Sequence, residues 1–223
     1  MIYLVLIRHG QSEWNKKNLF TGWTDVGLSE QGKEEAKQTG LNLRNKNIVF
    51  EKAFSSALKR AIQTMEIVLQ NMSLSIPFTK AWQLNERHYG QLQGKNKQEI
   101  INKFGEEQVQ KWRRGFITAP PPLTTQQTLS NIELYQTLKE IPQSESLKDT
   151  QDRVLPFWSH SIYPCIKDQK SVLITAHGNS LRALIKKLEV LSDEDISSVE
   201  VKTGQALIYQ LDQQARVLHK ESL

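Results

Sequence analysis

The sequence predicts an α/β fold in which a mainly parallel central sheet carries helices on both faces. Short apolar runs of strand length alternate along the chain with longer segments in which apolar residues recur every three or four positions. This alternation is typical of parallel sheets, because a crossover between parallel strands usually contains a helix. The 223 residues suit a single domain over residues 1–223, with a small helical insertion expected at about 82–143.

The N-terminal half is expected to contain strands and helices in alternation. Ser29 precedes a segment with helical periodicity and is the expected N-cap of the first long helix. A second helix begins near Leu58, where apolar residues recur at i+3, i+4 and i+7, so Lys59 and Arg60 fall in its first turn. Short runs rich in apolar residues predict strands at residues 4–7, 49–54 and 76–79.

The C-terminal half begins with two short amphipathic helices that are expected to end at Arg114. Residues 115–132 contain no charged side chain and include three consecutive prolines, so this segment is predicted to be flexible. A helix follows from about residue 146, and Pro156 is expected either to kink it or to mark its true start. Further strands are predicted at residues 172–176 and 206–211, the second closing the sheet.

Composition limits the function classes. The net charge of +5 suits an anionic partner, but the basic cluster at residues 111–114 lacks a nucleic-acid-binding motif, so a small anion is favoured over nucleic acid. No apolar run approaches the roughly 18 residues of a membrane span, and no signal peptide is recognised. The single cysteine, Cys165, suits a reducing cytoplasm, and the five histidines lack metal-ligand spacing, so no metal is expected.

Two of the predicted strands end in the same pair of residues, a histidine followed by a glycine. His9 follows residues 4–7, and His177 follows residues 172–176. The carboxyl ends of parallel strands form the edge where ligands bind in open α/β sheets, so both imidazoles are expected there. A neutral histidine is a competent nucleophile toward phosphorus, and arginines match phosphate oxygens in pairs. With Arg8 beside His9, phosphoryl transfer is the chemistry that this edge predicts.

An acid is needed to protonate the leaving oxygen in such a transfer. Glu86 is the only carboxylate within residues 84–90, a loop otherwise composed largely of side chains suited to binding ligands. The ordinary alternative for Glu86 is an ion pair with Arg87. The ordinary alternative for the basic residues at 113 and 114 is a solvated helix face.

The motifs around these residues resemble the histidine phosphatase superfamily and, within it, the 2,3-bisphosphoglycerate-dependent phosphoglycerate mutases. Residues 6–15, LIRHGQSEWN, are similar to the superfamily signature. The resemblance extends from about residue 3 to about residue 211. Other matching segments, several of them more specific to the mutases, are FTGW at 20–23, LKRA at 58–61, LNERHYG at 84–90, LQG at 92–94, WRRG at 112–115 and HGNSLR at 177–182.

The resemblance implies a phosphoglycerate mutase-like fold and a role for each matching residue. His9 would carry the phosphoryl group, Glu86 would donate and accept a proton, and Arg8, Arg60 and His177 would surround the transferred group. The implied substrate-binding residues are Ser12, Asn15, Thr21, Gly22, Tyr89, Lys97, Arg113, Arg114, Gly178 and Asn179. The implied reaction interconverts 3-phosphoglycerate and 2-phosphoglycerate in glycolysis and gluconeogenesis, with 2,3-bisphosphoglycerate as the primer and no metal.

Two other functions stay open at this point. A small-molecule phosphatase of the same superfamily would pass the phosphoryl group to water, and only residues 217–223 follow as a tail that could cover the site. A binding protein would use the same pocket as an anion site, which is disfavoured because no catalytic position is missing. The expected partners are small phosphoglycerates. A homodimer or homotetramer is implied by the resemblance alone.

Overall fold

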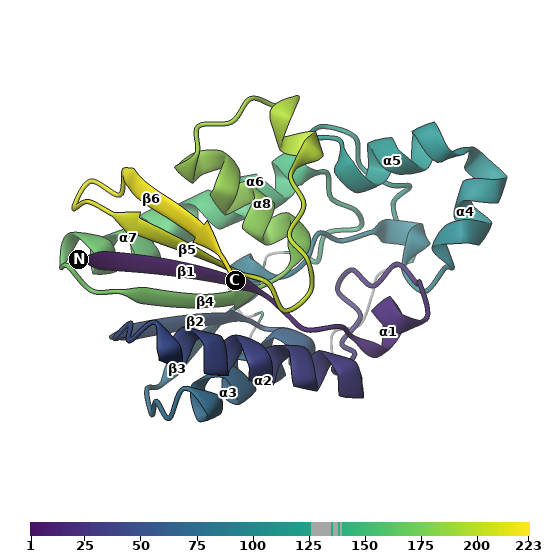
Figure 1. Cartoon of the computed structure of the whole chain (residues 1–223). Coiled ribbons are helices and arrows are strands. Elements are labelled where there is room, and N and C mark those ends of the chain that lie inside the picture. Colours follow the sequence, from purple (N-terminus) through teal and green to yellow (C-terminus); the bar gives the residue numbers. More distant parts are fainter. Residues whose placement is uncertain (126–134, 136–137, 139) are drawn as a thin grey trace.

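The computed structural model has an α/β fold built on one sheet (Figure 1). The structure describes residues 1–125, 135, 138 and 140–223, and within them six strands lie in the order β3-β2-β4-β1-β5-β6. The strands are β1 (Ile2–Arg8), β2 (Lys52–Ser56), β3 (Phe78–Ala81), β4 (Val172–Ala176), β5 (Ala206–Leu211) and β6 (Val217–Ser222). Strands β1 to β4 pair in parallel, whereas β5 pairs antiparallel with both of its neighbours, β1 and β6. The predicted mainly parallel sheet is confirmed.

Helices cover both faces of this sheet (Figure 1). Leu4 and Leu6 of β1 belong to the core beneath the helices of one face, while Val5 and Ile7 belong to the core beneath those of the other. Successive side chains of a strand point to opposite faces, which explains why β1 is an unbroken apolar run. One face carries α2 (Glu30–Asn45) and α3 (Lys59–Asn71); the other carries α6 (Leu147–Phe157), α7 (Tyr163–Lys167) and α8 (Gly178–Leu188).

The strand order brings distant parts of the chain to one edge. β4 lies between β1 and β2, and Arg8 at the end of β1 is in register with Ala176 at the end of β4. The two residues that follow, His9 and His177, therefore leave the sheet side by side. The sequence predicted a shared edge for them but not this adjacency.

Smaller helices lie beyond the carboxyl end of the strands, at the right of Figure 1. They are α1 (Glu13–Lys16), α4 (Lys97–Phe104) and α5 (Glu106–Arg114), and the last two fall in the predicted insertion. Phe20, Ile100 and Trp112 are among the residues of a separate small core there. That 1–223 is a single domain stays a prediction. Residues 126–132 of the uncharged stretch lie outside the described residues.

Several element boundaries differ from the sequence prediction. β2 and β3 begin later than expected, and β2 continues to Ser56, beyond its apolar part. β5 does not close the sheet: a turn in which Asp212 N–H donates to the Arg216 carbonyl leads into β6, which the sequence missed. β6 is a mostly exposed edge strand, so it lacks an apolar run. Pro156 lies near the end of α6, not at its start, and a π-helical turn at Trp158–Ile162 follows. In the described part, no helix is long and apolar enough to cross a membrane.

Candidate active site

His9 and His177 lie together at the carboxyl ends of β1 and β4, with ring centroids 4.8 Å apart. His9 Nδ1 is 2.7 Å from the carbonyl oxygen of Gly10. A carbonyl only accepts, so Nδ1 carries the proton and Nε2 keeps its lone pair. Burial, with the positive charges of Arg60 and Arg8, holds the pKa of His9 well below its ordinary 6.5. His9 is therefore neutral at pH 7, with a nucleophilic Nε2.

The second imidazole is fixed from behind by the neighbouring strand. His177 Nε2 lies 2.6 Å from Oγ of Ser56, the last residue of β2. His177 Nδ1 is buried and has no hydrogen-bond partner among the described residues. Burial, with Arg60 and His9 nearby, also holds the pKa of His177 well below 6.5. The ring is therefore anchored at Ser56 and at the start of α8, where its side chain takes part in a capping box with Ser180.

The guanidinium groups of the half-buried Arg8 and the buried Arg60 flank His9. Arg60, in the first turn of α3, donates through Nη1 to the Thr24 carbonyl at 2.9 Å and through Nη2 to the Gly22 carbonyl at 2.8 Å. Gly22 has φ +55°, a left-handed conformation that favours glycine. Arg8 Nη1 donates to the Val201 carbonyl at 2.6 Å. Among the described residues, the Nε atoms of Arg8 and Arg60 have no partner, so two buried donors await an anion.

Glu86 holds one carboxylate oxygen in place and leaves the other for chemistry. Oε1 accepts hydrogen bonds from Arg87 N at 2.8 Å, Asn179 N at 3.1 Å and Asn179 Nδ2 at 2.9 Å. Oε2 faces the pocket near Arg8: a β-carbon on Gly178 would lie 3.7 Å from Oε2 and 3.8 Å from the Arg8 guanidinium carbon. The carboxylate is 8% exposed, so its position is defined by the protein.

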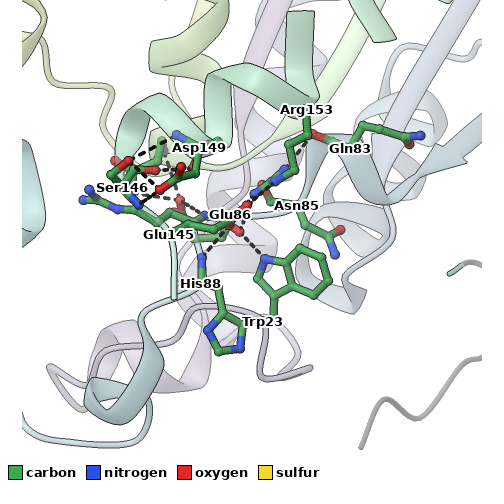
Figure 2. A network of polar contacts seen from close by, with 12 residues as sticks. Trp23, Gln83, Asn85, Glu86, His88, Glu145, Ser146, Asp149 and Arg153 are labelled. Carbon is green, nitrogen blue, oxygen red and sulfur yellow. Dashed lines mark hydrogen bonds and ion pairs between the residues drawn. The ribbon is translucent and has the colours of Figure 1, made fainter. Parts of the chain in front are cut away.

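The loop that carries Glu86 is fixed by a buried ion pair from α6, shown in Figure 2. Arg153 contacts both oxygens of Glu145, with Nε–Oε1 at 2.7 Å and Nη2–Oε2 at 2.9 Å, and Glu145 accepts from His88 N at 2.8 Å. Trp23 Nε1 donates to the Glu86 carbonyl from the opposite side. Arg153 also donates to the carbonyls of Gln83, Asn85 and Glu86 at 2.7, 3.0 and 3.0 Å. The backbone carbonyl of Glu86 is therefore held between Arg153 of α6 and Trp23.

Arg8, His9, Arg60 and Glu86 are among the residues that line a pocket of about 180 Å³. Burial and the charges of Arg113 and Arg8 lower the pKa of Lys97 to about 8. Such a surplus of positive charge suits a ligand with more than one anionic group. Among the described residues the lining cations are Arg8, Arg60, Lys97, Arg113, Arg114 and Arg182, against the carboxylates Glu86 and Glu200. The described residues contain no group of three histidine, cysteine or acidic side chains that could hold a metal ion.

Comparison with known proteins now gives the family. Residues 4–222 match the histidine phosphatase superfamily (branch 1). The chain is 52% identical over 225 residues to a 2,3-bisphosphoglycerate-dependent phosphoglycerate mutase from Staphylococcus carnosus, with 99% of each chain covered. It is 50% identical over 228 residues to 2,3-bisphosphoglycerate-dependent phosphoglycerate mutase 2 from Lactiplantibacillus plantarum, and the match covers 100% of this chain and 99% of that one. The chain belongs to this mutase family.

Solved structures show the same fold at lower identity. A mycobacterial glucosyl-3-phosphoglycerate phosphatase is 20% identical with a TM-score of 0.76, covering 100% of this chain and 97% of that one. The Bacillus stearothermophilus protein YhfR is 23% identical with a TM-score of 0.70, covering 95% and 92%. At this identity the match establishes the fold alone.

The structure gathers nearly all of the predicted site residues around one pocket. His177 lies behind His9 and not on the lining. Ser12 is also off the lining, contrary to its expected place: it is fully buried, and its hydroxyl and amide both bond Asn15 to cap α1. The predicted residues that line the pocket are Arg8, His9, Asn15, Thr21, Gly22, Arg60, Glu86, Tyr89, Lys97, Arg113, Arg114, Gly178 and Asn179.

Two charged residues of the lining, Arg182 and Glu200, have no role in the sequence prediction. Arg182 Nη1 donates to Asn179 Oδ1 at 3.0 Å, which turns the Asn179 amide nitrogen toward Glu86. The sequence does contain a pattern that points to Arg182, because Arg182 lies one helical turn after Asn179 within the HGNSLR segment at 177–182. Glu200 had no such signal, since it lies in a loop outside every motif.

Proposed function

We propose that this chain interconverts 3-phosphoglycerate and 2-phosphoglycerate through a phosphohistidine at His9. The observation that carries the proposal is the neutral His9 ring, whose Nδ1 is engaged by the Gly10 carbonyl and which lies beside the Arg8 and Arg60 Nε donors that have no partner among the described residues. A nucleophile surrounded by fixed donors supplies the positioning and charge stabilisation that phosphoryl transfer requires. The full-length relatives named as mutases support this reaction over a phosphatase.

In one half of the reaction, phospho-His9 passes its phosphoryl group to the 2-hydroxyl of 3-phosphoglycerate. In the other half, His9 Nε2 bonds to the phosphorus on O3 of the bisphosphorylated intermediate as that phosphorus–oxygen bond breaks, which releases 2-phosphoglycerate. The Nε donors of Arg8 and Arg60, unpartnered among the described residues, stabilise the equatorial oxygens, and His177 supports His9 from behind. These groups are already fixed by backbone carbonyls and by Ser56, so little reorganisation is required as charge moves.

Proton transfer is assigned to Glu86. When His9 returns the phosphoryl group to a substrate hydroxyl, Glu86 Oε2 accepts the hydroxyl proton; in the reverse step it protonates the leaving oxygen. The three hydrogen bonds to Oε1 hold the carboxylate in position throughout. Conversion of one isomer into the other requires both phosphate-bearing oxygens to reach His9 and Glu86 in turn.

A phosphoglycerate has a second anionic end, its carboxylate, which requires cations away from His9. The lining residues proposed for that end are Lys97, Arg113 and Arg114. The remaining lining residues proposed to contact the substrate are Asn15, Thr21, Gly22, Tyr89, Gly178 and Asn179. Gly178 and Asn179 open helix α8, where backbone N–H groups favour an anion.

The site also fits 2,3-bisphosphoglycerate, the compound in the names of the relatives. The described residues include four unpartnered buried polar atoms around this region: Arg8 Nε, Arg60 Nε, Thr21 Oγ1 and His177 Nδ1. When bound, the compound supplies the phosphoryl group that His9 carries. Independence from metals, a cytoplasmic location and a homodimer or homotetramer stay predictions.

The test measures 2-phosphoglycerate formation from 3-phosphoglycerate, with and without added 2,3-bisphosphoglycerate, while inorganic phosphate is followed in parallel. Isomerisation that is stimulated by the primer and outpaces phosphate release is expected. Phosphate release faster than isomerisation would assign the chain to the phosphatases of its superfamily. A chelator is expected to leave the rate unchanged, and strong inhibition would contradict a metal-free reaction.

A further inference from the structure

The pocket lining contains a carboxylate that the proposed reaction does not use. Glu200 lies in the loop between a short helical turn at Asp195–Ser198 and β5, and its side chain lines the pocket. Glu200 Oε1 is 3.0 Å from Arg114 Nη2. Arg114 Nη1 donates to the Val199 carbonyl at 3.3 Å. Both terminal nitrogens of Arg114 are thus engaged by the same two residues of the loop.

This arrangement conflicts with the role proposed for Arg114. A guanidinium binds a carboxylate or phosphate best through paired N–H donors, and those donors face the Glu200 loop. The Arg114 side chain is 29% exposed and that of Glu200 61%, so the pair lies at the mouth of the pocket. An exposed ion pair of this kind contributes little stability, and an incoming anion can displace its carboxylate at small cost.

The backbone of the loop is anchored independently of Glu200. Arg182 Nη2 donates to the Ile196 carbonyl at 2.6 Å, and Arg8 Nη1 donates to the Val201 carbonyl at 2.6 Å. Val201 is buried at 2% exposure. The loop can therefore stay in place while the Glu200 side chain turns away, so the exchange of partners at Arg114 is local.

We infer that Glu200 is a specificity-determining residue whose carboxylate occupies Arg114 in the free protein and is displaced by the second anionic end of the substrate. The inference rests on the proposed function, which places that end at Arg114. Glu200 then weakens the binding of ligands that reach Arg114 and has less effect on a small anion held only between Arg8 and Arg60. If Glu200 instead served to orient Arg114 for the substrate, its removal would weaken binding, so the two roles predict opposite signs.

The test compares Glu200→Gln with a matched control, Glu107→Gln. Glu107 is an exposed residue of α5, is paired with Lys111 Nζ at 2.7 Å and is absent from the pocket lining. Its replacement by glutamine makes the same change in net charge and also removes the carboxylate of an exposed ion pair. Calorimetry measures the Kd of 3-phosphoglycerate and of inorganic phosphate at low salt, and steady-state assays give KM and kcat. Circular dichroism checks that both variants are folded.

Glu200→Gln is expected to tighten 3-phosphoglycerate binding roughly two- to fivefold, the range of an exposed ion pair. It should lower KM without raising kcat, while inorganic phosphate changes less, and the gain should shrink as salt is added. Glu107→Gln should match the wild type. If the wild type isomerises but Glu200→Gln binds 3-phosphoglycerate no more tightly than the control does, the role of Glu200 is wrong while the proposed function stands. If the wild type neither binds nor isomerises 3-phosphoglycerate, the proposed function falls with it.

Discussion

Replacing Arg153 by methionine should destabilise the fold, because it leaves the buried carboxylate of Glu145 without its partner. The side chains of this pair are 9% and 5% exposed. Removing one member of a buried pair costs about 3–5 kcal/mol, out of a total unfolding free energy of roughly 5–15 kcal/mol. In a chain of this length each kcal/mol lowers Tm by about 2–4 °C, so a decrease of roughly 6–20 °C is expected.

The assay is thermal and denaturant unfolding at neutral pH, applied to Arg153→Met, Glu145→Gln and the double variant. The double variant should be more stable than the sum of the single losses predicts, because no unpaired charge remains. The folded fraction of Arg153→Met should also have a lower kcat, since Arg153 binds the Glu86 carbonyl at 3.0 Å. Lys148→Met, which breaks the exposed pair with Asp152 on the same helix, is the control and should leave Tm unchanged.

An Arg153→Met variant whose unfolding free energy lies within about 1 kcal/mol of the wild type would contradict a buried ion pair at this position. So would a double variant whose loss equals the sum of the two single losses, since residues that form a buried ion pair should couple.

Three further predictions concern the site and its support. Glu86→Gln keeps the acceptor at Oε1 but cannot take up a proton, so kcat should fall about 10²- to 10⁴-fold with KM little changed, and an unchanged kcat would place the acid elsewhere. The pKa of Lys97 is lowered to about 8, so the free protein loses this positive charge as pH rises through about 8. KM for 3-phosphoglycerate should therefore rise above that pH, and a Lys97→Met variant that keeps the same rise would reject the assignment. Gly32→Ala places a β-carbon 2.0 Å from the Gln11 carbonyl oxygen, so it should lower Tm and kcat together by displacing the loop after His9, and a wild-type Tm would contradict this packing.

The sequence predicted the strands that are buried on both faces and the helices that bury one continuous face. β4, residues Val172–Ala176, is buried on both faces and is apolar except for Thr175, whose hydroxyl donates to the Ala61 carbonyl. α3 buries one face and shows the helical period. β6 has neither pattern, because Leu218, His219 and Lys220 lie exposed on a sheet edge, and its pairing depends on the preceding turn.

The site residues that the sequence predicted are those within local motifs, such as Glu86 and Asn179. Apart from Arg182, which bonds Asn179 within one motif, those that it missed act through contacts between distant segments. Glu200 meets Arg114 across 86 positions of the chain, and Arg153 reaches the Glu86 carbonyl across 67. A local pattern carries no information on such pairs, and it could not give the strand order that places His9 beside His177.

The most direct test of the central claim is the identification of the phosphorylated residue. The protein is mixed with radiolabelled 2,3-bisphosphoglycerate and quenched rapidly, and the labelled peptide is located by mass spectrometry. We expect an acid-labile, alkali-stable phosphate on the peptide that contains His9. It should be transferred to phosphoglycerate when unlabelled 3-phosphoglycerate is added, and it should be absent in His9→Ala. A label on another residue, or one that persists in His9→Ala, would contradict the account.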